Sequence, residues 1–393
     1  MSGVPISVMT IACGIIAAGS YFAQPLAPSI AQDLSLGGWM AGLVVTVGQL
    51  GYCLGLILVA PLADILENRR LLVTTLAVSA LSMVVGATAS TGSVFLTACF
   101  GIGLASTAVQ MIVAQAALSS PPSSRGKVVG RVTGGLLFGI LLAWPVANII
   151  AGHAGWRTLY ALQSAAITAL MVGLHRLLPR RRPAAHQSYG ATLQSLWPIW
   201  RDTPELRTRA IAQALLFGVF SLVWTMAPLL LRHRYGLDAT GLAWFGLAGA
   251  AGALVAPLAG RVADRGYGRA AAAAGVISVI AGCLIMLIGG RLWILALAFI
   301  AVGAGVQTNH VVSQRRVIAL NPQAPNRLNS LYVAVFFLGG AAGSAVAAPL
   351  GLTNWDLPAL VGAVTAIATP VLLVRGRNHS GLPMPDNNHV SNA

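Results

Sequence analysis

Residues 61–70 read PLADILENRR and place two acidic and two basic side chains between two long apolar runs. The whole chain of 393 residues has only nine acidic residues, so this stretch concentrates a scarce residue type. A second stretch of similar character, GRVADRGYGR, occupies residues 260–269, and it places Asp264 200 positions after Asp64. Because that offset is about half the chain, the two stretches indicate a duplicated unit.

The composition indicates which solvent surrounds the protein. Hydrophobic residues make up 56% of the chain and charged residues 8%, with a mean hydropathy of +0.78. Soluble domains carry about 25% charged residues, so lipid must cover most of this surface. The four cysteines lie in separate apolar runs, which fits small core residues better than a disulfide framework or a metal cluster.

Twelve apolar stretches of about 20 residues are each long enough to cross a bilayer as a helix. The β-barrel alternative would need short alternating segments, and none are visible. We therefore predict an all-α membrane protein with twelve transmembrane helices in two pseudo-symmetric six-helix bundles. The predicted spans are 5–26, 39–61, 71–90, 93–116, 128–151, 157–177, 208–231, 239–260, 270–289, 292–313, 328–350 and 357–374.

The longest connection between spans separates six helices from six. Within it, LQSLWPIW at 193–200 predicts a short interfacial helix. The polar chain end predicts disorder. The predicted division is an N-terminal bundle at 1–177, a cytoplasmic central loop at 178–207, a C-terminal bundle at 208–375 and a disordered cytoplasmic tail at 376–393.

The basic residues predict the orientation. If the N-terminus is cytoplasmic, only four of the 24 basic residues fall outside: Arg157, Arg232, Arg234 and Arg291. This positive-inside bias predicts a multi-pass protein of the cytoplasmic (inner or plasma) membrane with both termini in the cytoplasm. It also accounts for the net charge of +15 without a nucleic-acid partner. We expect the basic run PRRRP (179–183) to lie against anionic lipid.

The two charged stretches also carry a family resemblance. APLADILENRR (60–70) keeps Asp64, Arg69 and Arg70 of the pattern G-x-L-A-D-R-x-G-R-R, and the later copy keeps Gly260, Asp264, Arg265 and Arg269. Together with the twelve spans and the half-length repeat, the chain resembles the major facilitator superfamily over essentially its whole length. Segments such as YFAQPLAPSIAQDL (21–34) and GILLAWPVANIIAGHAGWRTLY (139–160) resemble its bacterial exporter-like, drug and sugar efflux-type branch.

The resemblance implies a gating role for the charged stretches, which would latch the two halves together on the cytoplasmic side. An acid at a helix end can pair with arginines or cap a helix N-terminus. The alternative is an ordinary charged turn that follows topology rules, and we expect Glu67 to be a solvated loop charge. The candidate gating residues are Asp64, Arg69, Arg70, Asp264, Arg265, Arg269, Arg125 and Arg327.

Polar side chains within the spans are costly unless they face water or partners. The resemblance implies a central cavity, so these positions are candidates for binding substrate. Gln307, His310 and Gln314 share one helix face by spacing. The alternative is that amides tie helices together and aromatic residues pack. The candidate substrate-binding residues are Gln24, Gln49, Gln110, Trp144, Asn148, Gln213, Trp224, Gln307, His310 and Tyr332.

No Asp or Glu lies within a predicted span, although a buried carboxylate is the usual proton carrier in such transporters. His310 is therefore the candidate for proton coupling, and the alternative is a neutral histidine that ties two helices together. The chain has no phosphate loop, zinc-ligand spacing or catalytic triad, so we expect neither an enzyme nor a cofactor.

These observations predict a secondary active transporter. We expect a monomer that moves a small neutral or amphipathic organic solute by alternating access, in the export direction, with membrane lipid as a partner and protons as the candidate coupling ion. Two alternatives stay open: an uncoupled facilitator, and a sensor or scaffold that uses the same fold without transport.

Overall fold

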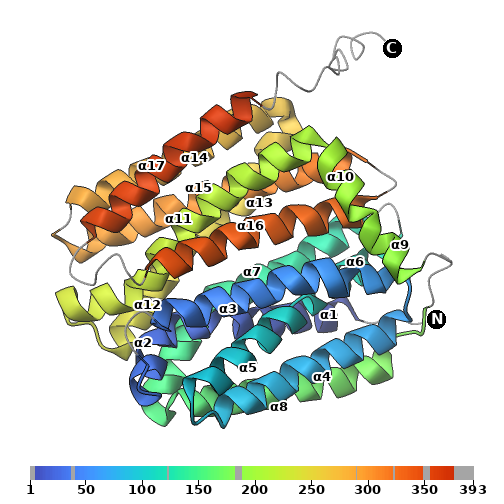
Figure 1. The fold of residues 1–393 in the computed structure, drawn as a ribbon, viewed down its shortest axis with the longest axis horizontal. Coiled ribbons are helices and arrows are strands. Elements are labelled where there is room, and N and C mark those ends of the chain that lie inside the picture. Colours follow the sequence, from blue (N-terminus) through green and yellow to red (C-terminus); the bar gives the residue numbers. More distant parts are fainter. Residues whose placement is uncertain are drawn as a thin grey trace.

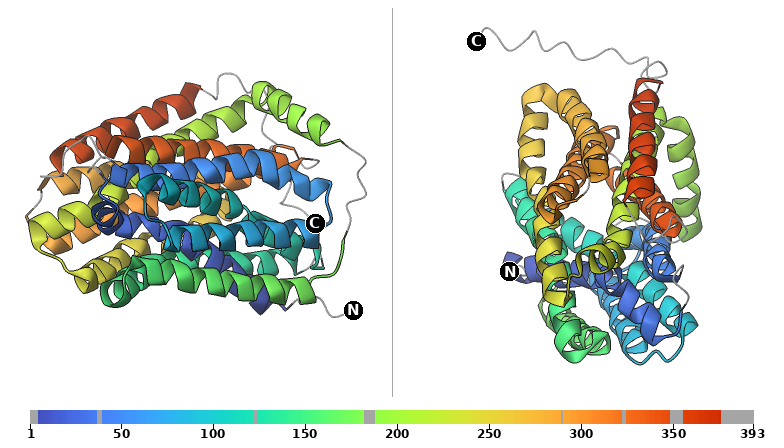
Figure 2. Two further views of the ribbon diagram at one scale, coloured as in Figure 1. Left: turned by 60° about the horizontal axis from the view of Figure 1, so that its bottom comes forward. Right: turned by 90° about the vertical axis from the view of Figure 1, so that its left-hand side faces the viewer.

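The computed structural model describes residues 5–36, 40–121, 124–181, 188–288, 290–321, 324–347 and 355–375. Within these residues every regular element is helical and no strand occurs, which confirms the predicted all-α class. The helices of the two chain halves form two groups that lie side by side (Figures 1 and 2). The predicted tail at 376–393 and part of the central loop, 182–187, lie outside the described residues.

The N-terminal group contains eight α-helices, and its second span ends in a π turn (η1) and a 3-10 turn (η2). The break between α1 and α2 bends the first span by 41°. The elements are α1 (Ile6–Tyr21), α2 (Ala23–Asp33), α3 (Met40–Leu54), η1 (Gly55–Val59), η2 (Ala60–Asp64), α4 (Asn68–Ala87), α5 (Gly92–Ala105), α6 (Ala108–Leu118), α7 (Arg125–Ala154) and α8 (Trp156–Leu177).

The C-terminal group begins at Pro204, four residues before the predicted boundary at 208, because proline is well tolerated in the first turn of a helix. Its elements are α11 (Pro204–Tyr235), α12 (Ala239–Ala250), η3 (Ala251–Val255), α13 (Ala256–Val262), η4 (Ala263–Tyr267), α14 (Gly268–Ile288), α15 (Leu292–Ala319), α16 (Pro325–Ala347) and α17 (Asp356–Arg375).

Within the described residues, each of the twelve predicted spans overlaps one helix or helices joined end to end. By length and hydropathy, nine helices of the described chain could cross a membrane, or ten if the bent pair α1 and α2 is one span. The count differs from twelve partly because the apolar part of α17 is short and because α13, η4 and α14 run together across a kink.

Two short helices, α9 (Tyr189–Gln194) and α10 (Leu196–Asp202), replace the single helix expected at 193–200. The Ser188 hydroxyl accepts a hydrogen bond from the Ala191 amide, which caps the start of α9. Both helices lie at one end of the molecule, at the right in Figure 1. We name this the linker end and the opposite end, where α2 turns toward α3, the distal end.

Each group has its own hydrophobic core, and two residues of the N-terminal group cross into the other core. Leu56 and Trp144 are buried within the cluster formed mainly by α11, α15 and α16. The groups meet where α3 packs on α16 and α7 packs on α12, and α2 also contacts α11. The interface between the bundles therefore carries side chains from both halves of the chain.

Candidate substrate site between the bundles

Two tryptophans, one from each bundle, meet at the centre of this interface. The rings of Trp144 on α7 and Trp224 on α11 lie edge to face, with centroids 4.7 Å apart and an angle of 81° between the planes. Both side chains are buried. Because each belongs to a different bundle, any motion that separates the bundles here must break this contact.

Two glycines of α12 make room for these rings. A Cβ atom at Gly246 would lie 2.6 Å from the Cβ of Trp144, and one at Gly249 would lie 2.9 Å from Cη2 of Trp224. The two glycines are three residues apart, so they lie on the same face of the helix. We name Trp144, Trp224, Gly246 and Gly249 the tryptophan socket.

Predicted amides flank the socket, and several of their atoms have no partner. Gln49 Nε2 donates to Ser221 Oγ of the other bundle at 3.0 Å, and Asn148 Nδ2 donates to the Trp144 carbonyl at 3.0 Å. Gln49 Oε1, Asn148 Oδ1 and Trp224 Nε1 are buried without a hydrogen-bond partner in the described chain. Such atoms are rare and costly in protein interiors, so they make this region a candidate site.

The polar groups of α15 contact helices of their own bundle. Asn309 Nδ2 donates to Gln213 Oε1 at 2.7 Å, and Gln213 Nε2 donates to the Val306 carbonyl at 3.3 Å. These hydrogen bonds join α11 to α15. They fit the alternative interpretation, in which amides within the spans connect helices and do not bind substrate. Gln307 is half-buried and has no hydrogen-bond partner among the described residues.

His310 and Gln314 both face α16, as their shared helix face requires. His310 Nδ1 lies 3.2 Å from the Tyr332 hydroxyl, and the two rings stack with centroids 5.7 Å apart. Gln314 Nε2 donates to Asn329 Oδ1 at 2.8 Å. His310 is thus held between two helices, and its predicted role in proton coupling stays a prediction.

Aromatic residues extend the interface toward the linker end. Tyr52 on α3 and Phe337 on α16 meet with centroids 4.5 Å apart, across the bundles. Gln110, a candidate substrate-binding residue, donates from Nε2 to the Tyr52 hydroxyl at 3.2 Å. It therefore holds the ring that contacts Phe337 of the other bundle. Gln24 is buried in α2 just after the bend and has no hydrogen-bond partner within the described chain.

Hydroxyl contacts close the interface toward the distal end. Thr46 Oγ1 and Ser344 Oγ lie 2.8 Å apart across α3 and α16, and Arg232 donates to Ser29 Oγ at 3.3 Å. We did not predict these residues as site residues. Serine and threonine are common in membrane helices, and only the packing of α3 on α16 shows that these two hydroxyls meet.

The first charged stretch lies at the linker end, and its contacts stay within the N-terminal half. Arg69 Nη2 lies 2.8 Å from His175 Nε2, and Asn68 Nδ2 donates to Gln115 Oε1 at 3.0 Å. Gln115 therefore ties α6 to the start of α4 at the linker end. Arg70 is exposed. The side chain of Asp64 lies outside the described part of the structure.

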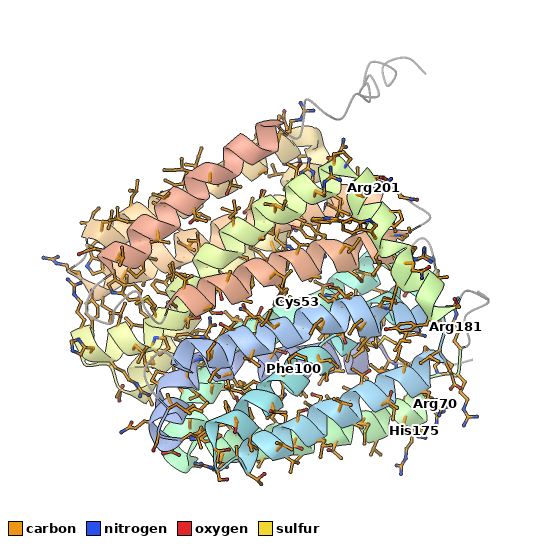
Figure 3. All side chains as sticks on the ribbon, viewed as in Figure 1. Cys53, Arg70, Phe100, His175, Arg181 and Arg201 are labelled. Atoms are coloured by element: carbon orange, nitrogen blue, oxygen red, sulfur yellow. The ribbon has the colours of Figure 1, made fainter. Side chains whose placement is uncertain are left out.

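The same stretch holds the central loop. Asn68 Oδ1 accepts a hydrogen bond from the Arg181 amide at 2.8 Å, and the Asn68 amide donates to the Arg181 carbonyl. Figure 3 shows Arg181 at the linker end, with Arg70 and His175. Glu67 differs from its predicted solvated state, because its side chain is only 18% exposed and lies 3.9 Å from Arg180.

The second charged stretch pairs within the C-terminal bundle. Asp264 forms an ion pair with Arg315 of α15, and Arg315 also donates to the Gly260 carbonyl at 3.0 Å. Glu205, which we did not predict as a site residue, lies 2.9 Å from Arg209 and 3.0 Å from Arg316. A latch between the halves thus stays a prediction for Asp264.

The remaining gating candidates lie on the surface of the linker end or against the linker. Arg125, Arg265 and Arg269 are exposed at helix starts or turns. Arg327 Nη1 donates to Ser195 Oγ, between α9 and α10, at 3.1 Å. No group of three His, Cys, Asp or Glu side chains in the described ranges could hold a metal ion.

The model of the Major Facilitator Superfamily matches residues 9–343, with a second match over 210–388. The chain belongs to this superfamily of transporters. It is 36% identical to the uncharacterized transporter YgaY of Escherichia coli O157:H7, over 94% of this chain and 95% of the relative. It is 25% identical to the chloramphenicol resistance protein of Streptomyces lividans and 24% identical to the probable sugar efflux transporter of Helicobacter pylori, which cover 94% and 81% of this chain.

Solved structures of superfamily transporters share the fold. A bacterial homologue of the human lysosomal transporter Spinster, in an inward-facing and unoccupied conformation, superposes with a TM-score of 0.71 and 16% identity, covering 94% of each chain. The nucleoside transporter NupG superposes with a TM-score of 0.72 at 13% identity, covering 96% of this chain and 99% of its own. The protein therefore has the fold that the sequence predicted, and the tryptophan socket lies between its two bundles.

Proposed function

We propose that the protein is a secondary transporter that exports a small neutral or amphipathic organic solute across the cytoplasmic membrane by alternating access. The tryptophan socket with its unpartnered amide and indole atoms carries this proposal. It offers aromatic surface and hydrogen bonds without a formal charge. The names of the chloramphenicol resistance and sugar efflux relatives support the same substrate class.

The distribution of charge supports a neutral solute. Every acidic residue in the described ranges lies in the first or last turn of a helix or in a connecting turn. A cationic solute would need an acidic residue in the low-dielectric centre of the membrane, because an unpaired buried ion is costly. Gln49 Oε1 and Asn148 Oδ1 can accept hydrogen bonds from hydroxyls, and Trp224 Nε1 can donate one.

The contacts between the bundles support alternating access with the linker end open. Direct contacts between the bundles extend from the distal end through the socket as far as Tyr52 and Leu56, whereas α13 packs against α14 and α15 of its own bundle. At the linker end α9 and α10 bridge the halves through Tyr189, which donates to the Leu58 carbonyl, and through Ser195. With the linker end in the cytoplasm, a solute would enter the site from inside the cell.

The test is counterflow in proteoliposomes with a panel of neutral sugars, neutral drug-like compounds and organic cations. We expect neutral compounds to exchange and Trp144→Ala to change the ratio of rates among them, because it removes one wall of the socket. Trp244→Ala is the matched control, since Trp244 lies on α12 but is 68% exposed. Preference for cations, or equal effects of both variants on every compound, would overturn the proposal.

An uncoupled facilitator is the second candidate function. It is favoured by the absence of acidic residues from the predicted spans and by His310, which already contacts Tyr332. Counterflow does not require coupling, so it would occur in both cases, and only accumulation driven by a pH gradient separates them. Absence of any counterflow across the panel would favour a sensor or scaffold instead.

A further inference from the structure

A groove runs along α8 on the outside of the N-terminal bundle, and the distal end of α4, with Val84 and Ala87, forms part of its wall. It has a volume of about 890 Å³, and α8 contributes residues from Ala161 to Arg176. That length of helix spans roughly 22 Å. Figure 1 shows α4 and α8 side by side at the lower edge of the molecule, on the side away from the C-terminal bundle. The groove is therefore separate from the substrate site.

The walls of the groove suit a hydrocarbon chain. They consist mainly of small or apolar side chains, such as Ala165, Ala169 and Gly173. The two hydroxyls of α8 in the groove are already bonded, since Ser164 donates to the Ala80 carbonyl and Thr168 to the Ser164 carbonyl, both at 2.9 Å. A wall without free polar atoms gains nothing from a polar occupant.

The linker end of the groove is basic. Arg176 lines the groove and is exposed, and the adjacent His175 lies against Arg69. Figure 3 shows Arg70 and His175 together at this end. Within the described residues, neither the Arg70 nor the Arg176 side chain has a hydrogen-bond or ion-pair partner. Glu67, at the start of α4, faces Arg180 at 3.9 Å.

We propose that this groove binds one anionic phospholipid, with an acyl chain along α8 and the headgroup phosphate at Arg176. Basic pockets between helices at the cytoplasmic surface attract anionic headgroups, and each basic residue contributes to that attraction. The lipid lies in the cytoplasmic leaflet when the linker end is cytoplasmic.

The proposal is tested on the full chain in detergent by native mass spectrometry and thermal melting. Phosphatidylglycerol is titrated beside phosphatidylcholine with the same acyl chains and beside soluble glycerol phosphate. We expect one saturable phosphatidylglycerol adduct that raises the melting temperature, because a ligand that binds the folded state stabilises it. Phosphatidylcholine and glycerol phosphate should each produce a much smaller shift.

Two variants locate the site. Ala169→Phe fills the groove from an exposed position and should remove the adduct, and Arg176→Gln should weaken it about fivefold. The matched controls are Ala273→Phe on the exposed face of α14 and Arg261→Gln on α13, which should bind as the wild type does. The proposal fails if the site variants bind like the controls, if both lipids bind equally, or if glycerol phosphate alone gives the full shift. If Ala169→Phe does not fold, Arg176→Gln decides alone.

Discussion

The socket and the linker end join their helices by different physical means. At the socket, neutral aromatic rings fit against glycines and stay buried. At the linker end, acids and arginines form ion pairs, as the exposed side chains of Asp264 and Arg315 do. Charges are costly in the centre of a membrane but cheap in water, where their pairs are weak. We therefore expect contacts at the socket to depend on how well the side chains fit together, and contacts at the linker end to depend on charge.

The largest expected effect comes from breaking the shape of the socket. Gly246→Ala adds a methyl group 2.6 Å from Trp144, so α7 and α12 must move apart. Overpacking of this kind costs about 1–3 kcal/mol, which corresponds to a loss in counterflow rate of about fivefold to more than a hundredfold if the closed distal end is required. Counterflow in proteoliposomes with equal amounts of protein measures this loss.

Two variants control for the effect of adding a methyl group. Gly130→Ala lies on α7, where the added Cβ meets no atom within 4 Å, so it should leave transport unchanged. Adding Trp144→Gly to Gly246→Ala removes both the ring and the Cβ atom that the new methyl group meets, so it should restore part of the rate. If Gly130→Ala is as damaging as Gly246→Ala, helix propensity and not the fit to Trp144 explains the loss.

His310 is the next test, because it could bring charge into the neutral middle region. His310→Gln keeps a hydrogen-bonding side chain near Tyr332 but cannot titrate. If the transporter is driven by protons through this residue, the variant keeps counterflow and loses several-fold accumulation when a pH gradient is imposed. Accumulation by the variant that equals the wild type would exclude His310 as the carrier.

The sequence predicts the two regions unequally well. Apolar length and the half-length repeat predicted the spans, because a helix must satisfy its own backbone in lipid. The residue types near the socket were also predictable, since amides within spans are rare. The packing of the two tryptophan rings against Gly246 and Gly249 was not predictable. The chain has 44 glycines, and only the structure shows which of them lie against a ring.

Partners at the linker end were the least predictable part of the site. The repeat singled out Asp64 and Asp264 but gave no reason to choose Arg315, since several arginines lie within reach of each loop. Asn68 is uncharged, so the search for gating charges did not select it. Its side chain nevertheless forms hydrogen bonds with Gln115 and with the backbone amide of Arg181. Such contacts depend on which helix ends meet, and that is decided by the three-dimensional packing.

The smallest effect is expected for the exposed ion pair of the second charged stretch. In the pair of Asp264 with Arg315, the side chains are 67% and 51% exposed, so Asp264→Asn should cost less than about 1 kcal/mol. Glu205→Gln should cost more, because Glu205 is 23% exposed and contacts two arginines. Thermal melting of both variants in detergent should give a clearly lower melting temperature for Glu205→Gln, and high salt should reduce the Asp264 effect further.

In proteoliposomes, Asp264→Asn should slow counterflow by no more than about fivefold. A larger loss of transport at an unchanged melting temperature would mean that Asp264 leaves Arg315 in another state and joins the two bundles, as the gating hypothesis from the sequence requires.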